Sequence, residues 1–303
     1  MKILVTGGTV FVSKYVAEYF VNKGHEVFVL NRNTRPQVEG VQLINCERNN
    51  LKDILKGHHF DAVLDITAYT RKDVEVLLSA LGEFDNYILI STSAVYSERD
   101  PQPFTEEQQT GRNIYWGEYS ANKIEAEEYL LEKVPHAYII RPPYIYGKMN
   151  NLYREAFVFD CAEKDMPFYI PKDGKMPLQF FDIEDLSRFM ELLLEKQPEQ
   201  RIFNVGNKDV ITISQWVELC YEVVGKTPEF KYVSEDIPQR SYFPFIDYSY
   251  ILDVSKQNEL LPGTKPMLQG LREAYEWYKN NREAVRKRPL IEFIEEKLIE
   301  DRE

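Results

Sequence analysis

Short apolar runs alternate with helix-like patterns through the first half of the chain, and this alternation restricts the fold more than any other feature. The predicted strands lie at 3–5, 27–30, 41–44, 62–66, 87–90 and 137–140, and the predicted helices lie at 15–23, 51–56, 73–81 and 120–133. Strands that are apolar throughout and joined by helices indicate a parallel sheet covered on both faces. Because such crossovers are right-handed, the sequence predicts a doubly wound α/β fold.

The pattern becomes irregular after Gly147. Prolines recur, and helices alternate with short strands such as 202–205, which is typical of a smaller, mixed region that borrows from the first domain. We expect a parallel-sheet domain at 1–147 that also uses about 178–210, a second region at 148–177 and 211–285, and an amphipathic C-terminal helix at 286–303.

The charge balance restricts the partners of this chain. It has 37 Lys and Arg against 49 Asp and Glu, a formal net charge of −12, so it has no bulk positive charge with which to bind a polyanion. No apolar run approaches the roughly 18 residues that span a bilayer. The first residues enter a strand pattern directly, without the charged and apolar regions of a signal peptide. We therefore expect neither a nucleic acid nor a membrane as partner.

Cysteine and histidine usage predicts neither a disulfide framework nor a metal site. Cys46, Cys161 and Cys220 are odd in number and far apart, so a reduced, cytoplasmic location is the simplest interpretation. The histidines are scattered without metal-ligand spacing, at His25, His58, His59 and His136. The pair at 58–59 precedes the fourth strand, opposite the expected site, and we expect it at the surface.

The segment from Thr6 to Ser13 follows the first strand, where a dinucleotide-binding protein places its Gly-rich turn. The pyrophosphate there contacts backbone N–H groups at a helix N-terminus. Three glycines are usual, at the positions of Gly7, Val10 and Ser13, and this chain keeps only the first, with Gly8 beside it. Serine is small, but a β-branched valine close to the pyrophosphate is expected to push that ligand outward or weaken its binding. A plain strand–turn–helix without ligand is the alternative.

The end of the second strand indicates the kind of dinucleotide. NAD-binding proteins usually carry an acid there for the adenosine ribose hydroxyl. This chain has Asn31, Arg32 and Asn33 there, with Arg35 nearby. No acid competes with a 2′-phosphate, and a guanidinium is available to bind one. The sequence therefore slightly favours NADP and leaves NAD open.

Tyr119 and Lys123 form the candidate catalytic pair. Their spacing places both side chains on one helix face, where an ammonium is expected to lower the pKa of the phenol. Such a tyrosine can exchange a proton with a hydroxyl while hydride moves to a nicotinamide. The chain contains this spacing five times, but only Tyr119 begins a helix beside a strand end that carries hydroxyls, at Ser91, Thr92 and Ser93. Ligands of open α/β sheets bind at that edge, so we place the active site there.

In this order, the motifs resemble the NAD-dependent epimerase/dehydratase family of extended short-chain dehydrogenase/reductases. The segments that carry the resemblance are Thr6–Thr9, Ser91–Tyr96, Tyr119 with Lys123, Arg141–Gly147, Asp182–Leu186 and Phe203–Gly206. The end of the second strand is also similar to the atypical branch near the chloroplast stem-loop-binding proteins. The resemblance runs from residue 1 to about 280 and implies that 1–147 is an NAD(P)-binding Rossmann domain.

The resemblance implies a role for each residue of the site. Tyr119 would be the acid/base, Lys123 would bind the nicotinamide ribose and tune the phenol, and Thr92 would hydrogen-bond the reacting oxygen. With the strand-end residues above, the expected cofactor contacts are Gly7, Thr9, Phe11, Val12, Asn31, Arg32, Arg35, Asp65, Ala68, Tyr69, Ser91, Lys123 and Pro142. The expected substrate contacts are Ser93, Tyr144 and Arg240, the last because a cation, hydroxyls and aromatics mix at 239–243.

Family substrates are mostly nucleotide-activated sugars, so the resemblance implies an epimerase or reductase acting on such a sugar or a similar polyol. Dehydratases of the family tend to carry an acidic pair directly after the Ser/Thr, whereas Ser93 and Ala94 follow Thr92 here. Two alternatives stay open: a non-catalytic NAD(P)-binding regulatory or scaffold protein, suggested by Val10, and an RNA-binding relative of the stem-loop-binding proteins, which the net charge opposes. A homodimer is expected from the resemblance alone.

Overall fold

Six strands from the first half of the chain and one from the second half form a seven-stranded sheet. The computed structural model describes residues 1–234 and 236–299. The strands of this sheet are β1 (Lys2–Thr6), β2 (Glu26–Asn31), β3 (Gln42–Asn45), β4 (Leu55–Asp65), β5 (Leu81–Ile90), β6 (Tyr138–Arg141) and β11 (Ile202–Asn204). Their order is β11-β6-β5-β4-β1-β2-β3, and every neighbouring pair is parallel.

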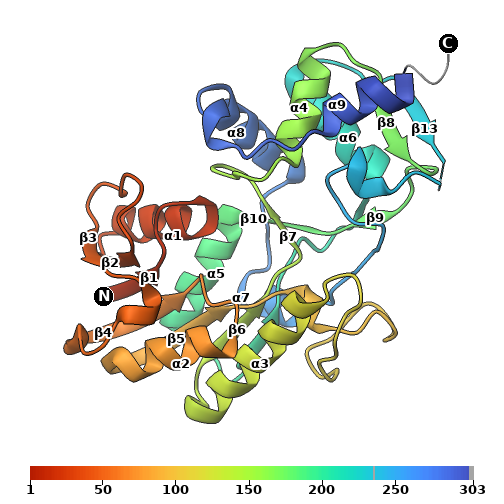
Figure 1. The fold of residues 1–303 in the computed structure, drawn as a ribbon. Coiled ribbons are helices and arrows are strands. Elements are labelled where there is room, and N and C mark those ends of the chain that lie inside the picture. Colours follow the sequence, from red (N-terminus) through yellow and green to blue (C-terminus); the bar gives the residue numbers. More distant parts are fainter. Residues whose placement is uncertain (235, 300–303) are drawn as a thin grey trace.

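Helices cover both faces of this sheet (Figure 1). They are α1 (Phe11–Asn22), α2 (Arg71–Ala80), α3 (Glu118–Lys133) and α5 (Ile183–Lys196). α1 and α5 pack on the face that Ile3 and Val5 point to, and α2 and α3 pack on the face that Leu4 points to. Since alternate residues of a strand face opposite sides, a strand covered on both sides is apolar throughout. The predicted doubly wound α/β fold is therefore confirmed.

The helix predicted at 51–56 is wrong. Arg48–Asn50 form a single 3-10 turn (η1), and β4 already begins at Leu55. β4 and β5 run past the edge of the sheet and pair with each other there, with Leu55 opposite Leu81. Leu55 is fully buried, so long-range strand pairing overrides the local helical spacing.

The second region combines short strand pairs with helices. Its strands are β7 (Tyr144–Tyr146), β8 (Phe168–Pro171), β9 (Pro177–Leu178), β10 (Phe180–Asp182), β12 (Ile211–Thr212) and β13 (Phe230–Val233). Its helices are α4 (Glu155–Glu163), α6 (Ile213–Val224), α7 (Ser255–Leu260) and α8 (Met267–Lys279), with 3-10 turns at Gln239–Ser241 (η3) and Arg282–Ala284 (η4). Phe180 stacks on Trp216, and Phe245 packs edge-on against that indole, in a separate aromatic core.

The C-terminal tail packs on the second region. α9 (Leu290–Phe293) continues as a π-helical stretch at Ile294–Ile299. Leu290, Ile291 and Leu298 are buried in the same core as α4 and α6, so the amphipathic face is covered by this chain itself. The helix is expected from residue 286, and it begins four residues later, at Leu290. The last part of the prediction, 300–303, lies outside the described residues. In the part of the chain that is described, no helix has the length and apolarity needed to cross a bilayer.

Candidate active site

The carboxyl ends of four neighbouring strands bring the predicted site residues to one edge of the sheet. The Gly-rich turn follows β1, residues 66–70 follow β4, Ser91–Ser93 follows β5 and Pro142 follows β6. α3 begins at Glu118, so Tyr119 lies in its first turn beside that edge. The β5 end and the start of α3 are in contact through the short turn η2 (Ser93–Val95).

The Gly-rich turn has the geometry of an anion site. Gly7 and Gly8 both have φ +93°, and a Cβ on Gly8 would lie 2.6 Å from Val29 Cγ1. The N-cap of α1 is Val10, which supplies no side-chain hydrogen bond, and the first turn of this helix contains no acid. Helix N–H groups without an internal partner favour a negatively charged group. The turn therefore fits the pyrophosphate that the family fold implies.

Val10 occupies its position in the turn without backbone strain. Its φ of −140° and ψ of 134° are extended, so the position needs no glycine. The side chain packs against the apolar core under α1. After the two glycines, the next positive φ of the segment is at Phe11, at 36°. A residue other than glycine in this region is uncommon and is often found at functional sites.

The end of β2 is tied to the turn by Asn31. Asn31 Nδ2 donates to Gly7 O at 2.6 Å, and Asn31 Oδ1 accepts from the backbone N–H of Asn33 at 2.9 Å. Arg32 and Arg35 are exposed, and neither forms an ion pair with any residue in 1–234 or 236–299. Two unpaired guanidiniums therefore flank the place where a dinucleotide ribose lies in this fold.

Asp65 is enclosed by protein partners. It is fully buried, and its carboxylate accepts hydrogen bonds from Thr6 Oγ1 at 2.8 Å and Tyr87 Oη at 2.6 Å, and pairs with Arg48. Burial opposes its ionisation, but the Arg48 guanidinium and the hydrogen bonds outweigh burial and hold the pKa of Asp65 below its usual range. Its acceptor sites are used within the protein, which leaves no exposed atom for the cofactor contact that the resemblance implies. The sequence reasoning missed Arg48, because nothing local links it to a strand end 17 residues away.

Lys123 is anchored to the ends of β4 and β5. It is 2% exposed, and its Nζ donates to Ala68 O at 2.7 Å and to Ile90 O at 2.8 Å. Burial lowers its pKa to about 8. The Tyr69 ring lies 5.2 Å from this ammonium and 6.4 Å from the Tyr119 ring, while Tyr69 itself is exposed. The structure thus brings Ala68 and Tyr69 to the candidate catalytic pair.

Tyr119 is close to Thr92. Burial raises the pKa of Tyr119, while the nearby Thr92 hydroxyl and the charge of Arg154 lower it. The expected lowering by Lys123 is not found, because that ammonium is turned toward the two backbone carbonyls. Because its pKa is raised, the protonated form of the phenol is favoured. In this form it can donate a proton, which is the role of a general acid.

The residues on either side of Thr92 have their polar groups engaged. The Ser91 hydroxyl donates to Glu127, and Ser91 is buried. The backbone N–H of Ser93 donates to Pro142 O at 2.9 Å. The Ser93 side chain lies beside Tyr250, which faces the second region. Of the two hydroxyl residues named with Thr92, only Ser93 is therefore directed to the substrate side.

Arginines gather on that substrate side. The Arg154 guanidinium carbon lies 4.8 Å from the centre of the Tyr144 ring. Arg240 donates to Pro244 O, and Arg288 Nη2 donates to Arg240 O at 2.6 Å. Burial and the like charges of Arg288 and Arg154 lower the pKa of Arg240. Among the described residues these three arginines form no ion pair, although the chain is acidic. Arg288 has no sequence signal that connects it with the site.

Trp116 is a further residue that the sequence reasoning missed. Its ring centre lies 5.9 Å from that of Tyr119 and 6.2 Å from that of Tyr250. Its Nε1–H is buried and has no hydrogen-bond partner among the described residues. Buried donors are nearly always paired, so this N–H keeps the capacity to donate one hydrogen bond. The indole is therefore a candidate donor to the substrate.

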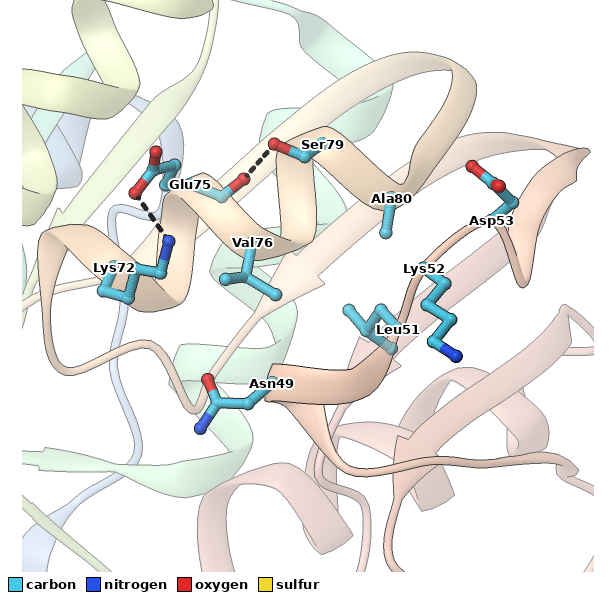
Figure 2. A pocket seen from close by; sticks show the side chains of 9 residues that line it. All are labelled: Asn49, Leu51, Lys52, Asp53, Lys72, Glu75, Val76, Ser79 and Ala80. Atoms are coloured by element: carbon cyan, nitrogen blue, oxygen red, sulfur yellow. Dashed lines mark hydrogen bonds and ion pairs between the residues drawn. The ribbon is translucent and has the colours of Figure 1, made fainter.

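Two other features contain none of the predicted site residues. Figure 2 shows a pocket of about 340 Å³ between α2 and the segment after η1, with the Lys72–Glu75 ion pair on its rim. Lysines and acids balance in its lining, which is Asn49, Leu51, Lys52, Asp53, Lys72, Glu75, Val76, Ser79 and Ala80.

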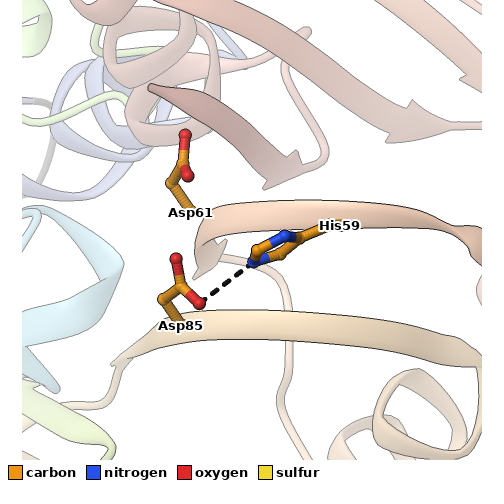
Figure 3. A group of neighbouring side chains, drawn as sticks. All are labelled: His59, Asp61 and Asp85. Atoms are coloured by element: carbon orange, nitrogen blue, oxygen red, sulfur yellow. Dashed lines mark hydrogen bonds and ion pairs between the residues drawn. The ribbon is translucent and has the colours of Figure 1, made fainter.

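The second feature is a group of side chains on the extension of β4 and β5, where His59, Asp61 and Asp85 place possible ligand atoms within 4.8 Å of one another (Figure 3). His59 Nε2 lies 3.0 Å from Asp85 Oδ1, which raises the pKa of the imidazole, and Asp61 accepts from Lys2 N at 2.5 Å. His59 is exposed, as expected, whereas His58 stacks on Phe60. Both acids already have protein partners.

Comparison with protein families assigns the class. Residues 3–79 and 73–206 match the model of the NAD dependent epimerase/dehydratase family, which is more than half of the 303 residues. The chain belongs to this family, as the sequence predicted, and it is an enzyme of that family.

Two curated relatives are similar to most of the chain. The chain is 28% identical over 301 residues to chloroplast stem-loop binding protein of 41 kDa b from Arabidopsis thaliana, covering 90% of this chain and 78% of that protein. It is 27% identical over 270 residues to UDP-glucose 4-epimerase of Corynebacterium glutamicum, covering 74% and 81%.

Solved structures show the same fold. The dTDP-glucose 4,6-dehydratase of Bacillus anthracis in complex with NAD matches with a TM-score of 0.74 at 20% identity, covering 93% of this chain and 98% of that one. The UDP-glucuronic acid 4-epimerase of Bacillus cereus, in complex with UDP-glucuronic acid and NAD, matches with a TM-score of 0.72 at 21% identity, covering 92% and 99%.

Proposed function

We propose that this chain is an NAD(P)-dependent epimerase or reductase that acts on a nucleotide-activated sugar. The observation that carries the proposal is the placement of Tyr119 in the first turn of α3, beside the strand end that carries Thr92, with Lys123 one helical turn further along and bonded to Ile90 O. A hydroxyl and a phenol that face each other beside a dinucleotide turn can hold one substrate oxygen between them and move its proton. The bound nicotinamide would supply or accept the hydride.

In the resting protein the chemistry is poised for proton donation. Burial raises the pKa of Tyr119 and so favours the protonated phenol, a form that can protonate a keto oxygen as hydride arrives. Thr92 orients that oxygen through its own hydroxyl. Lys123 is charged at pH 7 with a pKa of about 8, and its buried ammonium contributes positive charge near the reacting centre.

The arginine cluster supports a phosphorylated substrate. Arg154, Arg240 and Arg288 are near one another and form no ion pair with any other described residue, and guanidiniums bind phosphate oxygens in bidentate fashion. The Tyr144 ring beneath Arg154 holds that guanidinium in place. A diphosphate here would let the attached sugar reach Tyr119, with Trp116 Nε1–H available to a sugar hydroxyl.

The cofactor preference rests on the end of β2. Arg32 and Arg35 are exposed and form no ion pair within the described part of the chain, and the end of β2 carries no acid that would repel a 2′-phosphate. We therefore propose a preference for NADP over NAD. The reaction type rests on Ser93 and Ala94, because a dehydration needs acid/base groups that these residues lack.

The first test is thermal unfolding of the protein with NAD⁺, NADP⁺, NADH and NADPH separately, since a ligand of the native state raises the midpoint. We expect the largest shift with NADPH. Turnover is then measured with UDP- and dTDP-linked hexoses and their 4-keto derivatives. Tyr119→Phe is expected to abolish turnover and to change cofactor affinity less than about twofold, because the phenol acts on the proton.

Tyr129→Phe is the matched control, since Tyr129 lies on the same helix and is also followed by a lysine four residues later. Full activity of Tyr119→Phe would refute the site. The name of the Arabidopsis relative raises stem-loop binding as a second candidate. A gel shift with a stem-loop RNA at low salt, lost on adding salt, would favour it over the enzyme.

A further inference from the structure

A buried ion pair lies directly beneath the candidate catalytic pair. α3 places Tyr119, Lys123 and Glu127 on one face at intervals of four residues. The Glu127 carboxylate accepts from Arg141 Nε at 3.1 Å and from Arg141 Nη2 at 2.5 Å. Both side chains of this pair are less than 5% exposed, and Arg141 is the last residue of β6. The pair therefore fixes α3 to the end of a central strand.

The same carboxylate holds the segment that carries Thr92. The Ser91 hydroxyl donates to Glu127, and the Ser91 backbone N–H donates to Ile140 O at 2.8 Å. On the other side of Thr92, the backbone N–H of Ser93 donates to the carbonyl oxygen of Pro142, the residue that follows β6. The backbone on both sides of Thr92 is thus fixed, and the Thr92 hydroxyl, which accepts from Ala94 N at 3.2 Å, lies beside the start of α3.

Arg141 extends these contacts across the sheet. Its Nη1 donates to Tyr96 Oη at 2.9 Å, and Tyr96 Oη donates to Asn204 Oδ1 at 2.7 Å. Asn204 is the last residue of β11, and its N–H donates to Glu106 at 2.9 Å. One set of buried hydrogen bonds therefore connects α3 with the ends of β5, β6 and β11.

We propose that Glu127 and Arg141 are positioning residues that set the distance between Thr92 and Tyr119. A buried ion pair is weak evidence for stability, because desolvation offsets its attraction. A precise orientation of reacting groups is worth much more, since a shift of about 1 Å can cost on the order of a hundredfold in rate. The reaction itself rests on the proposed function, but the positioning can be measured in the resting protein.

The experiment uses protein labelled with 13C at the tyrosine Cζ, and the Tyr119 resonance is assigned by its loss in Tyr119→Phe. Thr92→Ala gives the change that follows complete loss of the contact. We expect Ser91→Ala and Glu127→Gln to move the same resonance in the same direction by at least about half as much. Where a substrate is found, we expect kcat to fall about tenfold with KM within about twofold.

Asp160→Asn is the matched control. Asp160 is also a buried carboxylate, which accepts from Tyr153 and Tyr278 at 2.6 Å each, but it lies in the second region on α4. Its loss should lower the unfolding midpoint and leave the Tyr119 resonance unchanged. This control separates the effect of losing any buried carboxylate from the specific effect of losing Glu127.

The outcomes are distinct. A folded Glu127→Gln with the wild-type Tyr119 resonance and only a lower unfolding midpoint overturns the proposal. If Glu127→Gln does not fold, Ser91→Ala decides, because it leaves the ion pair with Arg141 intact. A wild-type protein that turns over no nucleotide sugar refutes the proposed function, while the resonance still tests the positioning.

Discussion

Replacing Asp65 by asparagine tests whether this residue holds the fold together or contacts the cofactor. The substitution keeps the shape of the side chain and removes its charge. In the folded protein Asp65 is fully buried and pairs with Arg48, whose side chain is 14% exposed. Asp65→Asn therefore leaves the guanidinium largely buried without its counter-charge, and the hydrogen bonds from Thr6 and Tyr87 lose a charged acceptor.

The structure gives the expected size and pH dependence of the effect. Removal of one partner from a buried pair costs about 3–5 kcal/mol, whereas an exposed pair is worth about 0–1 kcal/mol. The folded-state pKa of Asp65 lies below its unfolded value, so the unfolded chain takes up the proton first as the pH falls. The stabilisation is complete above the unfolded pKa of about 4 and is lost as the pH falls through the folded value.

Urea unfolding at pH 7 and at stepwise lower pH measures this difference against the wild type. Glu75→Gln, which removes the exposed Lys72–Glu75 pair, is the control and should change the free energy of unfolding by less than about 1 kcal/mol. Arg48→Met in the Asp65→Asn background should restore part of the loss, because no unpaired charge stays buried. A loss below about 1 kcal/mol, combined with a large drop in cofactor affinity, would refute the structural role and restore the cofactor contact.

Three further substitutions test the turn and the lysine. Gly8→Ala should cost about 2 kcal/mol more than Gly24→Ala in urea unfolding, because both glycines have a positive φ but only the first would bring a Cβ against Val29. Val10→Gly should lower stability by about 1 kcal/mol, because the extended backbone at this position does not require glycine. Cofactor affinity, measured by calorimetry, should rise less than about threefold, and a large gain in affinity would contradict this. The buried Lys123 loses its proton near pH 8 when folded and near 10.4 when unfolded, so stability rises with pH between these values. The wild type should therefore gain about 2 kcal/mol relative to Lys123→Met from pH 7 to 10, and a flat difference would contradict the burial of the charge.

The parts of the site that the sequence predicted are those encoded by one element and its neighbours. Continuous apolar runs reveal strands that are covered on both faces. The hydroxyl residues after β5 precede α3 in the sequence and also lie next to it in the fold. The parts it missed depend on long-range pairing. Arg48 reaches Asp65 from a different strand end, and Arg288 joins Arg240 from 48 residues further along. The prediction of a helix at 51–56 is wrong for the same reason, because pairing with β5 makes Leu55 the first residue of β4.

Burial along α3 explains why Tyr119 differs from the other tyrosines that precede a lysine by four residues. Tyr119 is partly exposed at the crevice, whereas Lys123 and Glu127 are 2% and 3% exposed. The helix face therefore runs from solvent into the core, with the Tyr119 phenol at its exposed end and the Glu127–Arg141 ion pair at its buried end. Glu127 lies four residues after Lys123 on the same helix and pairs with Arg141 at the buried end of this face. Tyr129 lacks such an acid, because its helix ends at Lys133. A phenol can be held to a reacting oxygen only when the helix that carries it is fixed, and the third residue of the pattern supplies that fixation.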